Sequence, residues 1–122
     1  MINSKAKGKR GELELVRLFK SYGYEAHRTS QYCGKTGEAP DVIGLSGIHV
    51  ECKFVEKLNI YDAITQAQRD AEAAGKGDLP AVFHRKNNCP WLVTMKADSF
   101  FAIYREWEAA RNGQDKADTG AN

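Results

Sequence analysis

The chain has 122 residues, the length of one ordinary domain. Hydrophobic residues make up 42% and charged residues 28%, which is typical of a globular protein and excludes a collagenous or wholly disordered chain. No apolar run reaches the roughly 20 residues that span a bilayer, and no apolar segment of a secretion signal follows the basic first ten residues. We therefore expect a cytoplasmic protein with one domain over residues 1–111 and a polar, disordered tail over residues 112–122.

The net charge of +2 conceals an uneven distribution along the chain. Residues 1–35 carry eight bases and three acids, a charge of +5, whereas residues 36–122 carry ten bases and thirteen acids, a charge of −3. A basic arm of this kind either contacts an anionic polymer or forms a solvated helix face, and composition leaves both open.

The three cysteines, Cys33, Cys52 and Cys89, are odd in number and have no CxxC spacing. This pattern does not indicate a disulfide framework or a zinc knuckle. A scattered metal site shared with histidines is an alternative, and we interpret all three cysteines as reduced thiols.

Apolar residues at helical spacing predict a first helix from about Arg10 to Tyr22, ended by a glycine. Glu12 precedes Leu15 and Phe19 of this stripe by three and seven residues, so its carboxylate shares their face and points toward the sheet. A buried acid is costly unless it is paired or bound to a metal. Glu12 is therefore a candidate site residue.

The rest of the chain alternates strand and helix signals. Asn59 is a predicted N-cap of a helix that has alanines at helical spacing and ends at Gly75, and a last helix begins near Asp98. The predicted strands are 25–29, 41–45, 48–54, 81–84 and 91–95. The order αβββαββα favours one mixed five-stranded sheet with helices on its faces.

Two neighbouring predicted strands carry a group of charged residues. Asp41 follows Pro40 at the start of one strand, and Glu51 and Lys53 project from one face of the next, with Cys52 on the other face. If these strands pair through the turn at residues 46–47, the three charged side chains converge.

Such a cluster suits phosphodiester hydrolysis. Asp41, Glu51 and the backbone carbonyl of Cys52 offer hard oxygen ligands for Mg²⁺ or Mn²⁺, and Glu12 would be a third carboxylate. A bound metal would lower the pKa of its water, and Lys53 could orient that water or stabilise developing charge. Glu51 and Lys53 alone would more simply be an exposed strand pair, but their combination with Glu12 and Pro-Asp favours a site.

In these residues the chain resembles the PD-(D/E)XK nuclease superfamily, and within it the archaeal-type Holliday junction resolvases and their phage-borne relatives. The segments that carry the resemblance are 8–12, 23–24, 28–30, 40–42 and 51–53. The resemblance implies a restriction-endonuclease-like α/β core. It also implies that Glu12, Asp41 and Glu51 bind metal and that Lys53 is the catalytic lysine.

The resemblance extends to further residues. Gln66 resembles a glutamine that helps arrange such sites from the helix after the motif lysine, although Gln68 is a rival and an ordinary solvated glutamine is an alternative. Ser30 resembles a loop serine near the cleaved strand. The bases expected to contact phosphates around the acids are Lys5, Lys7, Lys9, Arg10, Arg28 and Lys35.

We therefore expect a metal-dependent, structure-specific DNA endonuclease that resolves four-way junctions. A nuclease for flaps or other branched DNA and a non-cleaving DNA-binding module are the alternatives. No groove-reading motif is present, which favours recognition of DNA shape. The resemblance implies a homodimer, and the apolar patch Phe100, Phe101, Tyr104 and Trp107 on the last helix is either its surface or core.

Overall fold

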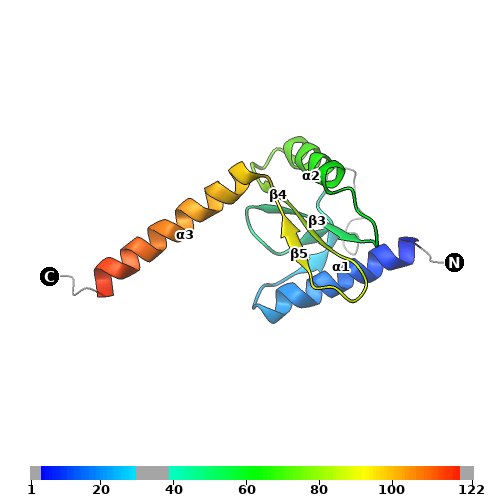
Figure 1. Cartoon of the computed structure of the whole chain (residues 1–122), viewed down its shortest axis with the longest axis horizontal. Coiled ribbons are helices and arrows are strands. Elements are labelled where there is room, and N and C mark those ends of the chain that lie inside the picture. Colours follow the sequence, from blue (N-terminus) through cyan, green and yellow to red (C-terminus); the bar gives the residue numbers. More distant parts are fainter. Residues whose placement is uncertain (1–3, 30–38, 119–122) are drawn as a thin grey trace.

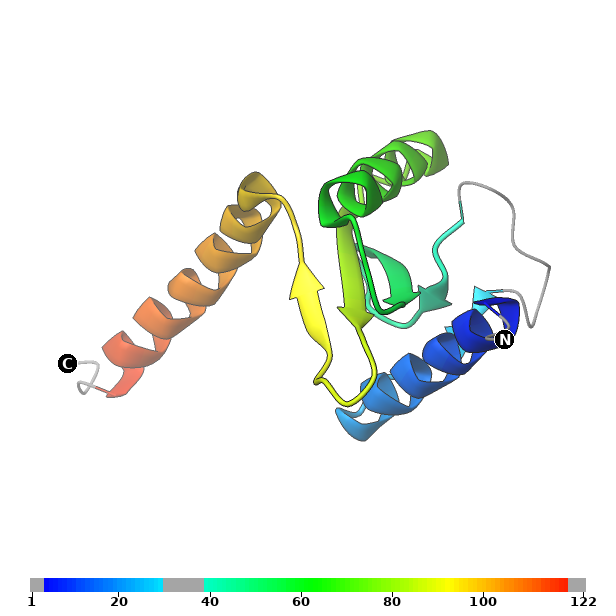
Figure 2. The ribbon, with the colours of Figure 1, turned by 45° about the vertical axis from the view of Figure 1, so that its right-hand side comes forward.

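A five-stranded mixed sheet forms the centre of the molecule, with helices packed on its two faces (Figures 1 and 2). The computed structural model describes residues 4–29 and 39–118. The elements in chain order are α1 (Ser4–Ser21), β1 (His27–Arg28), β2 (Val42–Ile43), β3 (Ile48–Phe54), α2 (Ile60–Ala74), β4 (Leu79–Arg85), β5 (Leu92–Thr94) and α3 (Ala97–Asp118). The predicted element order and the mixed sheet are confirmed.

The strands lie in the sheet in the order of the sequence, β1 to β5. Strands β3 and β4 are parallel, and the other neighbouring pairs are antiparallel. Val42 of β2 pairs with Val50 of β3, and Glu51 of β3 pairs with Val82 of β4. Since side chains alternate along a strand, Val50 lies on the face covered by α1, whereas Glu51 and Val82 lie on the face covered by α2.

Helix α1 packs on the sheet through the apolar stripe that the sequence predicts. Leu15, Val16 and Phe19 are buried against Val42 and Val50. At the other end of α1, an added Cβ atom on Gly11 would lie 2.7 Å from Cβ of Phe54. A glycine at this position lets the helix approach the end of β3 closely, which places the next residue, Glu12, at the sheet.

Helix α2 connects the parallel strands β3 and β4 and covers the opposite face of the sheet (Figure 2). The Asn59 side chain accepts a 3.1 Å hydrogen bond from the backbone N–H of Asp62, which confirms the predicted N-cap. Gly75 ends the helix in the left-handed conformation at φ 69°. The buried side chains of α2 are small, and Ala63 and Ala67 pack against Val82.

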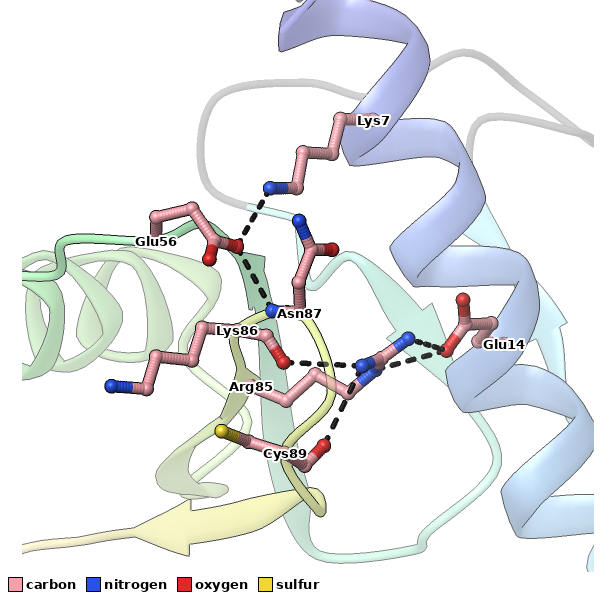
Figure 3. A network of polar contacts seen from close by, with 7 residues as sticks. All are labelled: Lys7, Glu14, Glu56, Arg85, Lys86, Asn87 and Cys89. Atoms are coloured by element: carbon pink, nitrogen blue, oxygen red, sulfur yellow. Dashed lines mark hydrogen bonds and ion pairs between the residues drawn. The ribbon is translucent and has the colours of Figure 1, made fainter.

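A polar network joins α1 to the β4–β5 turn and to the loop after β3 (Figure 3). Glu56 accepts 2.9 Å hydrogen bonds from Nζ of Lys7 and from the backbone N–H of Asn87. These two donors lower the pKa of the Glu56 carboxyl, the backbone N–H having the larger effect. The Arg85 guanidinium donates to Oε1 of Glu14 at 2.8 and 3.0 Å and to the carbonyls of Lys86 and Cys89.

Helix α3 extends away from the sheet and from the other helices (Figures 1 and 2). Ser99 in its first turn is buried, but all described side chains from Phe100 to Gln114 are exposed. Within the described chain, the aromatic patch of α3 is therefore surface rather than core. Among residues 4–29 and 39–118, no helix combines the length and apolar character that a membrane span requires.

The element boundaries differ most from the sequence predictions in three places. Helix α1 begins at Ser4 rather than near Arg10, because lysine and alanine favour helix and Lys7 is held by Glu56. Strands β1 and β2 have two residues each, and Gly44, packed against Ala26, follows β2. Helix α3 includes residues 112–118, which the sequence places in a tail. Asn112 and Gly113 have low helix propensity, but adding residues to an existing helix is much easier than nucleating one.

The close approach of α1 to β3 makes Gly11 and Gly8 a matched pair of test positions. We expect Gly11→Ala to lower the free energy of unfolding by about 1–3 kcal/mol, because the new methyl group forces Phe54 to move. Gly8→Ala, with no atom within 4 Å of its added Cβ, should raise that free energy by about 0.5–1 kcal/mol. Urea unfolding followed by circular dichroism measures both, and equal effects would contradict the packing.

Candidate active site

Asp41 lies at the point where β2 begins, and both its backbone and its side chain bond to β3. Its N–H donates to the carbonyl of Val50 at 2.8 Å, and its Oδ2 accepts from the N–H of Cys52 at 2.7 Å. The carbonyl of Pro40 instead accepts from the Thr29 hydroxyl at 2.6 Å. The Asp41 carboxylate therefore accepts the hydrogen bond from Cys52 that a backbone carbonyl would accept if the ladder between β2 and β3 were longer.

Glu51 lies beside Asp41 on the same face of the sheet. The pairing of Val42 with Val50 puts Asp41 opposite Glu51 when the antiparallel register is continued by one residue. Glu51 is 2% exposed and Asp41 is 7% exposed. Nε2 of His49 lies 3.0 Å from Oε1 of Glu51, and this contact is buried. Two buried acidic residues thus lie opposite each other, Glu51 on β3 and Asp41 directly before β2.

Glu12 reaches the sheet from α1, as its position on the apolar stripe predicts. Its Oε1 accepts a 2.9 Å hydrogen bond from Nε of Arg28 in β1. The two side chains are 20% and 14% exposed, so the pair is partly shielded from water. The sequence predicts a phosphate contact for Arg28, whereas the structure shows this arginine bound to a site acid.

The Cys52 thiol lies within the electrostatic influence of the charged residues of the site. Burial raises its pKa most, and the negative charges of Asp41, Glu12 and Glu51 raise it further, in that order. The ammonium of Lys53 acts in the opposite direction. All four predicted charged residues of the site therefore lie within electrostatic reach of one residue of β3.

Gln66 and Gln68 lie on different sides of α2. Gln68 donates to Glu72 at 3.0 Å and lines a cavity with Lys96 and Asp98, at the start of α3. Ala74, two turns after Gln66, lines a different cavity beside β2 and residues 39–40. Because Gln66 and Ala74 share a helix stripe, Gln66, an exposed residue, lies on the side of α2 that faces β2.

Comparison with known protein families and with solved structures gives matches of both kinds. The family model described as "Archaeal holliday junction resolvase (hjc)" matches residues 3–69. The chain belongs to the archaeal Holliday junction resolvase family. The 1.6 Å structure of Archaeoglobus fulgidus Hjc, a Holliday junction resolvase, matches with a TM-score of 0.54 and 22% identity, over 73% of this chain and 72% of that chain. A comparison with curated protein sequences gives no match.

The resolvase family confirms the predicted function class and the predicted fold. The chain is a junction-resolving endodeoxyribonuclease of the PD-(D/E)XK superfamily, with a restriction-endonuclease-like fold. The matched residues 3–69 contain Glu12, Asp41, Glu51, Lys53 and Gln66 and end before β4, β5 and α3.

Resolvases of this family generally depend on a divalent metal ion. The donors in this chain fit such an ion chemically, because Asp41, Glu51 and the Cys52 carbonyl supply oxygens, the ligands that Mg²⁺ and Mn²⁺ take. Among the residues that the structure describes, no three acids, histidines or cysteines are already grouped as a metal site. The fit therefore rests on Asp41, Glu51 and the carbonyl, with Glu12 held at Arg28.

The bases predicted to rim the resolvase site have different environments. Lys5, Lys9 and Arg10 of α1 are exposed, and the Arg10 guanidinium lies 5.0 Å from the Phe54 ring centre. Lys7 is paired with Glu56. Ser30 and Lys35, and with them Cys33, lie outside the described residues.

Sequence reasoning missed two buried polar groups near the candidate residues Glu51 and Gln66. His49 contacts Glu51, and the alternation of side chains on β3 would have placed them on one face. Asp70 follows Gln66 by one helical turn, and its buried Oδ2 has no hydrogen-bond partner among the residues that the structure describes. No sequence signal marks Asp70, because its burial depends on how α2 packs.

Proposed function

We propose that this resolvase cuts opposed strands of a four-way DNA junction by metal-dependent phosphodiester hydrolysis at Asp41, Glu51 and Lys53, with Glu12 as a third acid. The observation that supports this site most is the buried pair of carboxylates on β2 and β3, next to an ammonium on the same strand. Two buried acids side by side repel each other, and a divalent cation would remove that cost.

Each residue of the proposed site has a distinct role. Asp41, Glu51 and the Cys52 carbonyl would hold Mg²⁺ or Mn²⁺, which when bound lowers the pKa of a water and offsets charge on the phosphate. Lys53 would stabilise the charge that develops on the phosphoryl oxygens. Gln66 would help orient the attacking water or Lys53, and its side of α2 supports it over Gln68.

The arginine of the Glu12–Arg28 pair would exchange partners when DNA binds. The planar guanidinium group forms paired hydrogen bonds with a phosphate as well as with a carboxylate. Arg28 can therefore move from Glu12 to a DNA phosphate. Glu12 would then be released toward the metal. Ser30 and Lys35, which follow Arg28 in the sequence, are proposed to contact the same DNA strand.

A junction cleavage panel tests the function and the site. With Mg²⁺, we expect cleavage of synthetic four-way junctions in preference to flaps and linear duplex. Asp41→Asn and Glu51→Gln should each lower the cleavage rate at least about 100-fold, because the metal ion that stabilises charge on the phosphate is no longer held. Junction binding in gel shifts should be retained, because neither substitution disrupts the fold.

Gln68→Ala serves as the matched control for Gln66→Ala in this panel, since both are glutamines of α2. Only Gln66→Ala should slow cleavage. Equal cutting of all substrates would contradict junction specificity, and full activity of both acid variants would show that the acids are misassigned.

The exposed bases at the start of α1 are proposed to contact DNA phosphates. We expect Lys9→Ala and Arg10→Ala to weaken junction binding and to reduce the slope of log K against log [salt] by about 1 each. Arg17→Ala, an exposed base farther along α1, is the control and should change neither. The measurement is fluorescence anisotropy from 50 to 200 mM salt. An unchanged slope in the Lys9→Ala, Arg10→Ala double variant would contradict the contact.

The exposed aromatic face of α3 supports a homodimer. Resolution needs two incisions, whereas the described part of one chain carries one acid cluster, at Asp41 and Glu51. Phe100, Phe101, Ile103, Tyr104 and Trp107 are between 37% and 54% exposed. Large side chains of about 150–250 Å² each, roughly half exposed, supply about 500 Å² of the approximately 800 Å² per partner that a stable interface buries. A second copy is the proposed occupant of this face.

The charge of α3 favours protein over DNA as its partner. The helix carries five acids and three bases, so it would repel phosphates. Its exposed edges carry both signs, such as Arg105 and Glu108, which can pair across a two-fold axis.

Light scattering after size exclusion tests this dimer. We expect the wild-type chain at twice its 13.6 kDa mass, and the Phe101→Glu, Trp107→Glu double variant at the monomer mass, because two charges cannot be buried unpaired. Tyr22→Glu, at an aromatic that is 75% exposed on the body, is the control and should stay dimeric. A dimeric double variant would exclude α3 as the interface.

A further inference from the structure

His49 is a buried histidine that has no role in the proposed reaction. Its exposed fraction is 1%, and that of Glu51, two residues later on the same face of β3, is 2%. Nε2 of His49 lies 3.0 Å from Oε1 of Glu51. His49 and Glu51 pair in the parallel ladder with Pro80 and Val82 of β4, so apolar neighbours flank both side chains.

The direction of this hydrogen bond follows from the chemistry of the two groups. The ionised carboxylate, which is the form that binds a cation, only accepts hydrogen bonds, so in that form Nε2 of His49 is the donor. A glutamate side chain has three rotatable bonds, and a donor at one of its oxygens fixes the plane and direction of the carboxylate. The backbone N–H of Cys52 fixes the orientation of the Asp41 carboxylate in the same way.

We propose that His49 is a positioning residue that holds the Glu51 carboxylate in the orientation in which it binds the divalent cation. This rests on the proposed function, because it takes Glu51 as a metal-binding acid. Second-sphere partners of ligating groups orient them in this way, and their loss typically weakens metal binding by about 10–100-fold. His49 itself touches neither the cation nor the DNA.

A histidine on the neighbouring strand β4 provides a matched control. His84 pairs with Lys53 in the ladder, and its Nε2 lies 2.8 Å from the Thr94 hydroxyl. It is thus a partly buried imidazole close to the site, and its ring nitrogen bonds to a threonine rather than to an acid. Replacing it removes an imidazole of the same sheet without removing the donor to Glu51.

The test measures Mn²⁺ binding to the DNA-free protein by isothermal titration calorimetry, together with the midpoint of thermal unfolding. We expect His49→Leu to weaken Mn²⁺ binding at least about 10-fold, since the donor is lost while volume is kept. His49→Gln, which retains an N–H donor, should stay within about threefold of wild type, and His84→Leu should bind Mn²⁺ as wild type does. A purely structural role would lower the unfolding midpoint of His49→Leu and leave its Mn²⁺ affinity unchanged.

The cleavage reaction gives a second readout. In His49→Leu the Mg²⁺ concentration for half-maximal cleavage should rise, and cleavage at saturating Mg²⁺ should approach the wild-type rate. If His49→Leu does not fold, His49→Asn replaces it, because its shorter amide cannot reach Glu51 in the same geometry.

The outcomes separate this proposal from the proposed function. Loss of Mn²⁺ binding in Glu51→Gln with wild-type binding in His49→Leu or His49→Asn would overturn the role of His49 alone. Wild-type Mn²⁺ affinity in Glu51→Gln would overturn the metal site on which the role depends.

Discussion

The hydrogen bond from the backbone N–H of Cys52 to Oδ2 of Asp41 is the contact on which the proposed site depends. Proline has no N–H, and the carbonyl of Pro40 is turned toward Thr29, so the ladder between β2 and β3 ends at Asp41. The Asp41 carboxylate then satisfies the next donor of β3. This arrangement buries the acid without leaving it unpaired and sets it opposite Glu51.

The rest of the fold brings other groups to this point. Gly11 allows α1 to lie against Phe54, and the next residue, Glu12, meets Arg28. Phe54 has the guanidinium of Arg85 4.1 Å from its ring centre, and Arg85 bonds to Glu14 on α1, so the helix is tied to the sheet on both sides of Glu12. The positions of the acids are therefore set by packing of rigid elements rather than by a loop.

Most of the fold could be predicted from the sequence, because local signals determine it: the helical stripe of α1, the Asn59 cap and the turn before β3 each need only neighbouring residues. Alternation on β3 also predicted the shared face of Glu51 and Lys53. The Arg28–Glu12 pair and the burial of Asp70 could not be predicted, since they depend on how separate elements pack. The pattern of α3 indicates an apolar face, but a pattern does not say what covers it.

The central claim is that Asp41, Glu51 and the Cys52 carbonyl form one binding site for a divalent cation. Crystals of the resolvase soaked in Mn²⁺ and measured at the manganese absorption edge test it most directly. We predict an anomalous peak in contact with these three groups, and its loss in crystals of Glu51→Gln. A peak at other residues, or an unchanged peak in the variant, would contradict the account.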